Sequence, residues 1–184
     1  METRKKIKWG IIGPGSIATA FAHSIKHCQN SELIGVFGRN EEKTLVFAKS
    51  FDIQSFQSLQ QFLSASDIDA IYVATPHSDH FTYALEAIKS KKHVLCEKPL
   101  GMNAAEVEEA IAVSKETNRI FVEASWNRWH PRSQRIREIV ASGELGKITR
   151  IRTCFTYDGL DEENIRLDPA LGGGILYDLG PYST

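Results

Sequence analysis

A glycine-rich stretch near the beginning of the chain has the spacing of a phosphate-binding loop. The sequence GPGSIA, which begins at Gly13, fits the pattern G-x-G-x-x-A. In such a loop Gly13 permits the tight turn, Gly15 lets a pyrophosphate approach a backbone without a Cβ atom, and Ala18 lets the following helix pack closely on the strand. The first helical amides, at Ser16 and Ile17, would then point at the phosphates. The alternative is a glycine turn that binds no ligand.

The residues after the next apolar run, LIGVF at 33–37, indicate which dinucleotide this loop would bind. The carboxylate that usually binds the adenine ribose stands at the end of the second strand. Here that position is Gly38, and Arg39 and Asn40 follow it. A carboxylate repels a 2′-phosphate, whereas an arginine pairs with one. The pattern therefore favours NADP and leaves NAD open. The competing interpretation is that Arg39 stacks on the adenine or points to solvent.

A lysine follows a later apolar run. Glu97, Lys98 and Pro99 come directly after the run HVLC. Because ligands bind at the carboxyl ends of the strands in open α/β sheets, we expect this lysine beside the cofactor. Its ammonium group can hydrogen-bond a substrate hydroxyl and take part in proton transfer. The competing interpretation is a surface lysine at the start of a loop.

The loop after the run AIYVAT supplies further polar groups. It contains Thr75, Pro76 and His77, and His80 stands three residues later. This polar loop and the lysine at position 98 argue against a methyltransferase, which is the other class with a glycine-rich cofactor loop. The two histidines have a spacing that suits a metal ion, but no third ligand is evident, so we expect no metal site.

Alternating short apolar runs and helix-period segments must position these groups. The apolar runs lack polar alternation, which indicates strands buried on both faces of a parallel sheet. Strands that alternate with helices over short connections are typical of βαβ units. We therefore predict an α/β fold with a Rossmann doubly wound parallel sheet. The predicted strands are 6–12, 33–37, 70–75, 93–97 and 120–124, and the predicted helices are 15–28, 45–51, 58–64, 81–88 and one that Asn103 and Glu106 begin as a capping box.

The pattern changes after the fifth predicted strand. We divide the chain into a dinucleotide-binding domain at 1–125 and a second domain at 126–184. In the second part we predict a helix at 132–142, a turn at 143–146 and a strand at 147–157 whose alternation suits a half-exposed, mostly antiparallel sheet. One strand and one helix cannot bury a sheet face alone. We therefore expect an incomplete start of a second α/β domain, and a chain that is part of a longer protein.

Charge and cysteine content narrow the class of protein. The formal net charge is −1, which gives no basis for a nucleic-acid partner. No apolar run approaches the about 20 residues of a membrane span, so we expect no membrane contact. Cys28, Cys96 and Cys154 are far apart and odd in number, which favours free thiols in a reducing compartment over a disulfide framework. We predict a cytoplasmic protein.

Four motifs together resemble those of the Gfo/Idh/MocA oxidoreductases. They are GPGSIA at 13–18, ATPHSDH at 74–80, EKP at 97–99 and GGGILYDLGPY at 172–182, and their order and spacing match across essentially the whole chain. The stretch EASWNRWHP at 123–131 is most similar to the branch that contains dimeric dihydrodiol dehydrogenases and NADP-dependent D-xylose dehydrogenases.

The resemblance implies a Rossmann domain followed by an open, largely antiparallel α/β domain. It also implies that Lys98 is catalytic and acts with Asp178 and Tyr182. The last two are four residues apart, so a helix would place both on one face. Many family members carry histidine at the tyrosine position. Tyrosine is similar to the dihydrodiol branch, and beside Lys98 it can donate or accept a proton.

The resemblance further implies hydride transfer between NADP(H) and a carbinol carbon of a sugar or cyclic diol. Trp126, Arg128 and Phe155 are expected at the substrate wall, because aromatic faces suit a sugar ring, although an interdomain core would suit the aromatic residues too. The alternative function is a non-catalytic NADP(H)-binding fragment. For the longer parent we expect a homo-oligomer, since family members often pair through the second-domain sheet. The expected cofactor-binding residues are Gly13, Gly15, Ser16, Ile17, Gly38, Arg39, Asn40, Thr75, Pro76, His77, His80, Glu97 and Lys98.

Overall fold

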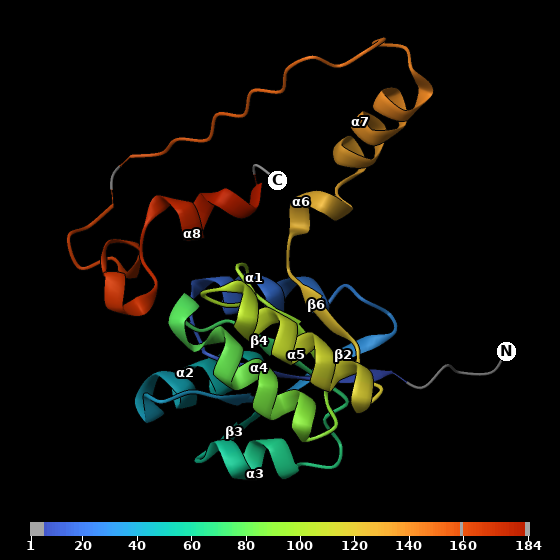
Figure 1. The fold of residues 1–184 in the computed structure, drawn as a ribbon. Coiled ribbons are helices and arrows are strands. Elements are labelled where there is room, and N and C mark those ends of the chain that lie inside the picture. Colours follow the sequence, from blue (N-terminus) through green and yellow to red (C-terminus); the bar gives the residue numbers. More distant parts are fainter. Residues whose placement is uncertain (1–5, 159, 183–184) are drawn as a thin grey trace, which may run out of the picture.

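The first two thirds of the chain form a six-stranded parallel sheet with flanking helices. After the last strand, β6, the chain consists of helices and irregular segments (Figure 1). The computed structural model describes residues 6–158 and 160–182. The strands are β1 Ile7–Ile12, β2 Ser31–Phe37, β3 Gln54–Phe56, β4 Ala70–Val73, β5 His93–Cys96 and β6 Phe121–Glu123. The α-helices are α1 Ser16–Ile25, α2 Glu41–Phe51, α3 Leu59–Ser64, α4 His80–Lys89, α5 Ala104–Glu116, α6 Trp126–Trp129, α7 Pro131–Ser142 and α8 Ile175–Leu179. The 3-10 helices are η1 His77–Asp79, η2 Ile165–Leu167, η3 Pro169–Leu171 and η4 Gly180–Tyr182.

The strand order is β3-β2-β1-β4-β5-β6, and every neighbouring pair is parallel. The chain winds outward from β1 to β3 and then crosses back to begin the other half at β4, so the direction of winding reverses between β1 and β4. This confirms the predicted Rossmann doubly wound sheet. The strand β3 was not predicted, because its three residues, QSF, contain no apolar run.

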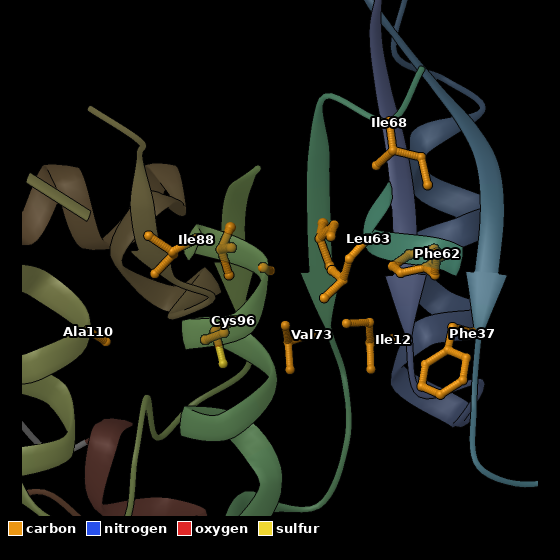
Figure 2. Close-up of a cluster of buried hydrophobic side chains, with 13 residues drawn as sticks. Ile12, Phe37, Phe62, Leu63, Ile68, Val73, Ile88, Cys96 and Ala110 are labelled. Atoms are coloured by element: carbon orange, nitrogen blue, oxygen red, sulfur yellow. The ribbon is translucent and has the colours of Figure 1, made fainter. Parts of the chain in front are cut away.

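Side chains of alternating direction on the strands build one core on each face of the sheet. On one face, Ile11 of β1 packs with the helices α1 and α2. On the other, Ile12 packs with α3, α4 and α5. Figure 2 shows this second core, where Ile12, Val73 and Cys96 of neighbouring strands point toward the same layer. Both faces are therefore covered, which explains why the strands read as continuous apolar runs.

Two of the helices that follow strands, α2 and α5, are capped by side chains at their first turn. Asn103 Oδ1 accepts a hydrogen bond from the Glu106 amide at 3.1 Å, and Asn103 Nδ2 donates to Glu106 Oε1 at 2.9 Å. The predicted capping box at the start of α5 is therefore confirmed in a reciprocal form. At the start of α2, Asn40 Oδ1 accepts from the Lys43 amide at 2.9 Å.

The predicted strand at 147–157 is wrong. The structure shows residues 147–158 as an extended segment that joins the region after α7 to η2, away from the strands (Figure 1). A strand requires backbone hydrogen bonds from a neighbouring strand, and none of the described residues pairs with this segment. The predicted helix at 132–142 forms as α7. Its apolar side chains do not form a core here, since Ile136 and Val140 are 52% and 45% exposed.

None of the helices in the described part of the chain combines the length and the apolar composition needed to cross a bilayer. The three cysteines Cys28, Cys96 and Cys154 are all free thiols in the structure.

Candidate active site

A cavity of about 720 Å³ lies at the carboxyl edge of the sheet, beside the point where the winding reverses. Its volume falls within the range of small-molecule and cofactor sites. Loops after β1, β2, β4 and β5 form one side, and the last part of the chain forms the other. Its lining includes residues 13–17, 38–40, 75–77 and 97–98 from the loops, with Phe155, Tyr157, Arg166, Asp178 and Tyr182 opposite them.

The glycine loop after β1 has the geometry of a cradle. Gly13 has a φ of +95°, in the left-handed region that favours glycine, and a Cβ atom there would lie 2.7 Å from the Ala74 carbonyl oxygen. The Gly13 amide donates to the Phe37 carbonyl at 2.9 Å, which ties the loop to the end of β2. A Cβ atom on Gly15 would meet nothing within 4 Å, so this backbone faces open space in the cavity. The loop therefore fits a phosphate group held against bare backbone.

The loop after β2 has no room for the usual carboxylate. A Cβ atom on Gly38 would lie 2.5 Å from Pro14 Cδ and 2.7 Å from Thr44 Oγ1. The ring of Pro14 and the side chain of Thr44 thus fill the place of an acidic side chain. The next residue, Arg39, lies 64% exposed with its Nη2 atom 2.9 Å from Asp79 Oδ2 on η1. Asn40 uses its side-chain oxygen Oδ1 as the α2 cap, so a ligand contact of this side chain would come from its Nδ2 group.

Two histidines hold the loop after β4. Both ring nitrogens of the fully buried His80 lie near carbonyl oxygens, Nδ1 at 2.7 Å from Pro99 and Nε2 at 2.9 Å from Thr75. His80 therefore ties the loop after β4 to the loop after β5. His77 Nδ1 donates to the Gly172 carbonyl at 2.8 Å and so ties the same loop to the end of the chain. Burial lowers the pKa of His77, against the opposing effect of that hydrogen bond.

A buried polar atom at this loop has no partner in the described part of the chain. Thr75 Oγ1 lies in the cavity wall, is buried, and makes no hydrogen bond with any described residue. Buried hydroxyl groups are usually hydrogen-bonded, so an atom of this kind in a cavity wall is suited to a ligand. The two histidines belong to no cluster of three His, Cys, Asp or Glu side chains among residues 6–158 and 160–182 that can hold a metal ion.

A buried ion pair joins the two sides of the cavity. Lys98, which follows β5, donates from Nζ to Asp178 Oδ1 at 2.7 Å and to the Asp178 carbonyl oxygen. The side chains are only 9% and 5% exposed. The Lys98–Pro99 peptide bond is cis. These contacts use two of the three N–H donors of the ammonium group and hold it at the cavity wall.

The Asp178 carboxylate has two more donors on its other oxygen. Tyr157 donates from its hydroxyl to Oδ2 at 2.6 Å, and Arg166 donates from Nε at 3.0 Å. Burial acts to raise the pKa of Asp178, but the hydrogen bonds from Lys98 and Tyr157 and the charges of Lys98 and Arg166 outweigh it, so this pKa lies below its ordinary value. The hydrogen bond to Asp178 raises the pKa of Tyr157. The carboxylate is therefore ionised at neutral pH and accepts hydrogen bonds from three side chains.

Comparison with known proteins agrees with this arrangement. The family described as "Oxidoreductase family, NAD-binding Rossmann fold" matches residues 7–125, and the family's "GFO/IDH/MocA C-terminal domain" matches residues 133–184. The chain belongs to the Gfo/Idh/MocA oxidoreductase family. The family resemblance predicted from the four motifs is therefore confirmed.

Relatives in this family include enzymes of two named activities. Trans-1,2-dihydrobenzene-1,2-diol dehydrogenase of Bos taurus is 34% identical over 179 residues, which cover 96% of this chain and 53% of that protein. D-xylose 1-dehydrogenase (NADP(+)) of Hypocrea jecorina is 31% identical and is matched over 96% of this chain and 51% of that protein. The crystal structure of an NAD-binding protein from Listeria innocua has a TM-score of 0.80 at 27% identity, covering 96% of this chain and 52% of that one. The chain spans about half the length of these relatives.

Several predicted residues of this Gfo/Idh/MocA chain come together around Lys98. The centroid of the Tyr182 ring lies 5.2 Å from Lys98 Nζ. The Phe155 ring stacks on the Tyr182 ring, with 5.6 Å between the two centroids and 14° between the two planes. The ring of Trp126 lies 6.2 Å from Tyr182 but is outside the cavity lining. Trp126 and Phe155 are 55% and 52% exposed, so neither is part of a core in the structure. Arg128 is not among the lining residues.

The structure adds three residues that the sequence patterns did not single out. Tyr157 and Arg166 contact Asp178, as described above, and Tyr72 of β4 donates from its hydroxyl to Glu97 Oε1 at 2.6 Å. Burial, more than the neighbouring Glu97 carboxylate, raises the pKa of Tyr72. A polar tyrosine inside a buried strand is a signal that it has a hydrogen-bond partner, and it identifies Tyr72 in retrospect. No comparable signal marks Tyr157 or Arg166.

Proposed function

We propose that the protein is an NADP-dependent dehydrogenase, or the cofactor-binding part of one, that acts on a hydroxyl-bearing carbon of a sugar or cyclic diol. The observation that carries this proposal is the buried Lys98–Asp178 pair, which lies in the wall of the same cavity as the open glycine loop. The names of the relatives, one acting on a dihydrodiol and one on D-xylose with NADP(+), support the substrate class and the cofactor.

The described residues fit the phosphate-bearing parts of the dinucleotide. The backbone at Gly13 and Gly15 and the first amides of α1, at Ser16 and Ile17, would hold the pyrophosphate. Arg39 at the end of β2 would meet the adenine ribose, where the space for a carboxylate is filled by Pro14. An arginine there favours a 2′-phosphate, so we propose NADP as the preferred cofactor, with NAD as the weaker one.

The residues around the opposite end of the cavity fit the nicotinamide and the substrate. Thr75, Pro76 and His77 form the wall beside the Lys98 ammonium group. The unpaired Thr75 hydroxyl offers a hydrogen bond to a ligand at this wall. Glu97, which accepts a hydrogen bond from Tyr72, lines the same wall. His80 holds the loops after β4 and β5 together through its hydrogen bonds to both. When bound, the nicotinamide supplies the chemistry of hydride exchange at its C4 atom.

The chain's own residues would manage the substrate oxygen. In the direction of reduction, a hydride adds to the carbonyl carbon and the carbonyl oxygen gains a proton. We propose that the Lys98 ammonium stabilises the negative charge that develops on this oxygen, and that Tyr182, whose ring lies beside that ammonium, supplies the proton. Asp178 holds the Lys98 ammonium group in place through their hydrogen bond. Oxidation of the alcohol runs through the same groups in reverse.

The aromatic residues near Tyr182 would form the substrate wall. Phe155 stacks on Tyr182 inside the cavity, so its ring suits the apolar face of a sugar or cyclic diol. Trp126 and Arg128 stay predictions as substrate contacts, because neither lines the described cavity. A cytoplasmic location and a homo-oligomeric parent also stay predictions.

The experiment that tests the proposal separates binding from turnover. NADPH fluorescence on mixing with the chain measures cofactor binding, and oxidation of D-xylose, D-glucose and a trans-dihydrodiol with NADP(+) measures activity, in this chain and in a longer parent. We expect Lys98→Met to lose most of kcat and to keep NADPH affinity, whereas Lys89→Met, at an exposed lysine of α4, changes neither. Binding without turnover in either protein would favour a non-catalytic NADP(H)-binding role. Absence of NADPH binding would overturn the proposal.

A further inference from the structure

An ion pair joins two loops at the adenine end of the cavity. Arg39 follows β2, and Asp79 stands on η1 after β4, on the other side of the central strand β1. Arg39 Nη2 lies 2.9 Å from Asp79 Oδ2. Arg39 lines the cavity at the position proposed to meet the adenine ribose. The Arg39 guanidinium is therefore already engaged by a carboxylate where a 2′-phosphate would arrive.

The pair is close, but it is not a well-formed hydrogen bond. Asp79 Oδ2 is buried and has no aligned hydrogen-bond donor in the described part of the chain, Arg39 included. The arginine side chain is 64% exposed, whereas the aspartate side chain is 24% exposed. Arginine has five N–H donors, and its strongest partners are carboxylates and phosphates that take two of them in parallel. The contact with Asp79 thus leaves the better-aligned donors of Arg39 for another anion.

We propose that Asp79 sets how strongly this chain distinguishes NADP from NAD, by holding Arg39 when no 2′-phosphate is present and sharing it when one is. This inference rests on the proposed function, since it takes the cavity as the cofactor site. With NAD bound, Arg39 keeps its carboxylate partner, so the absence of the 2′-phosphate leaves no unpaired charge. With NADP bound, the Asp79 charge opposes the phosphate dianion through the same guanidinium. Asp79 therefore weakens the preference for NADP and makes NAD acceptable.

The direction of the effect follows from comparing two contributions of Asp79. Its carboxylate restrains a long, mobile side chain, which favours phosphate binding slightly. It also neutralises part of the arginine charge, so that less of this charge attracts the phosphate dianion, which disfavours binding. The second contribution acts on a dianion and is therefore the larger. Exposure to solvent keeps both small, since ion pairs of exposed arginines are weak and screened by salt.

The test measures binding only and uses fragments of the two cofactors as probes. Calorimetric titration of the full chain with adenosine 2′,5′-bisphosphate and with adenosine 5′-monophosphate, which differ only in the 2′-phosphate, gives the affinity ratio that reports this group, and NADPH fluorescence shows separately that the site exists. We expect Asp79→Asn to raise this ratio about three- to fivefold, almost wholly through the bisphosphate. We expect Arg39→Ala to lower the ratio about tenfold. Glu42→Gln removes a nearby charge on α2 from a side chain that forms no ion pair among the described residues, and it should leave the ratio unchanged.

The double variant Asp79→Asn/Arg39→Ala decides whether Asp79 acts through Arg39. If it does, the double variant has the ratio of Arg39→Ala alone. An unchanged or lowered ratio in Asp79→Asn would overturn the inference, and so would an Asp79→Asn effect that persists at full size without Arg39. In each of these cases the wild-type chain still binds NADPH, so the proposed function survives the failure of this inference. Loss of NADPH binding by the wild type would instead remove both.

Discussion

Removing one partner of the Lys98–Asp178 pair should release the end of the chain from the sheet domain without unfolding the sheet. The side chains are 9% and 5% exposed, so Asp178→Asn leaves a buried ammonium group without its counter-charge. Breaking a buried ion pair in this way typically costs about 3 to 5 kcal/mol. We take the lower end, about 3 kcal/mol, because the Asp178 carbonyl oxygen still accepts from Lys98 and because Arg166 can turn to water.

This loss of free energy should make residues 166–182 detach more often from the loops of the sheet. The contacts that hold residues 166–182 against the loops include the Lys98–Asp178 pair and the hydrogen bonds from His77 to the Gly172 carbonyl and from Tyr177 to the Met102 carbonyl. Loss of about 3 kcal/mol raises the equilibrium constant for opening by about 150-fold.

Hydrogen exchange of the backbone amides in residues 166–182 measures this opening directly. The informative amides are those of Gly173, which donates to the Asp168 carbonyl, and of Asp178, which donates to the Gly174 carbonyl. Exchange at these positions should accelerate in Asp178→Asn, whereas amides of β1 and β4 should keep their protection. Tyr177→Phe is the matched control, because it removes a single neutral hydrogen bond and should cost only about 1 kcal/mol.

A double-mutant cycle tests the physical reason. Lys98→Met and Asp178→Asn should each cost about 3 kcal/mol. The double variant should also cost about 3 kcal/mol, because it leaves no unpaired buried charge: the Arg166 side chain that loses Asp178 is 43% exposed and can turn to water. Costs that simply add, to about 6 kcal/mol, would refute the argument that the uncompensated charge is what destabilises the single variants.

The same pair predicts a dependence on pH. The folded structure lowers the pKa of Asp178 below its ordinary value of 3.8. A lowered carboxyl pKa contributes stability at pH values above the ordinary pKa, and this contribution is lost as the pH falls through the folded-state pKa. The difference in thermal stability between the wild type and Asp178→Asn should therefore be constant from pH 7 down to about 4 and shrink below it. A difference that shrinks already near neutral pH would contradict the assignment.

Three further predictions concern single positions. Because burial lowers the pKa of His77 below 6.5, thermal stability should fall as the pH drops through 6.5, and His77→Gln, which cannot titrate, should lose that part of the slope in unfolding scans. Gly38→Ala should cost about 1 to 3 kcal/mol in denaturant unfolding, since its Cβ atom would lie 2.5 Å from Pro14 Cδ, and adding Pro14→Ala should recover part of that loss. Tyr157→Phe should remove one late-titrating phenol from the alkaline ultraviolet titration, because the hydrogen bond to Asp178 raises the pKa of Tyr157; if the phenol that disappears is instead one that titrates at the ordinary value of 10.0, the hydrogen bond is absent in solution.

Predictions from local sequence patterns succeeded where the structural feature is formed by residues that are close together in the sequence. The parallel strands were predicted from apolar runs, because each strand is buried on both faces and needs no alternation. The capping box at Asn103 was predicted from a spacing of three residues, and both of its hydrogen bonds form. The predicted strand at 147–157 does not form. Its alternation of polar and apolar side chains suits a strand, but a strand also needs a neighbouring strand as a partner, and none of the described residues provides one.

The site was predictable in part for the same reason. Lys98 and the glycine loop were found because residues at the carboxyl ends of parallel strands converge by topology alone. Tyr157 and Arg166, which contact one carboxylate oxygen of Asp178, lie 21 and 12 positions from it along the chain. No regular spacing marks such contacts, so only the folded arrangement reveals them.

The sequence by itself determined the Rossmann sheet, its glycine loop and the family, because these depend on local periodicity, on backbone conformations that only glycine adopts, and on short motifs. Tertiary structure alone decided which charges meet. It paired Asp178 with Lys98, gave Arg39 the carboxylate of Asp79 as a neighbour, and filled the space beside Gly38 with Pro14. The physical reason is that an ion pair or a steric exclusion depends on distances of a few ångströms between loops, which the strand order sets and the spacing along the chain does not.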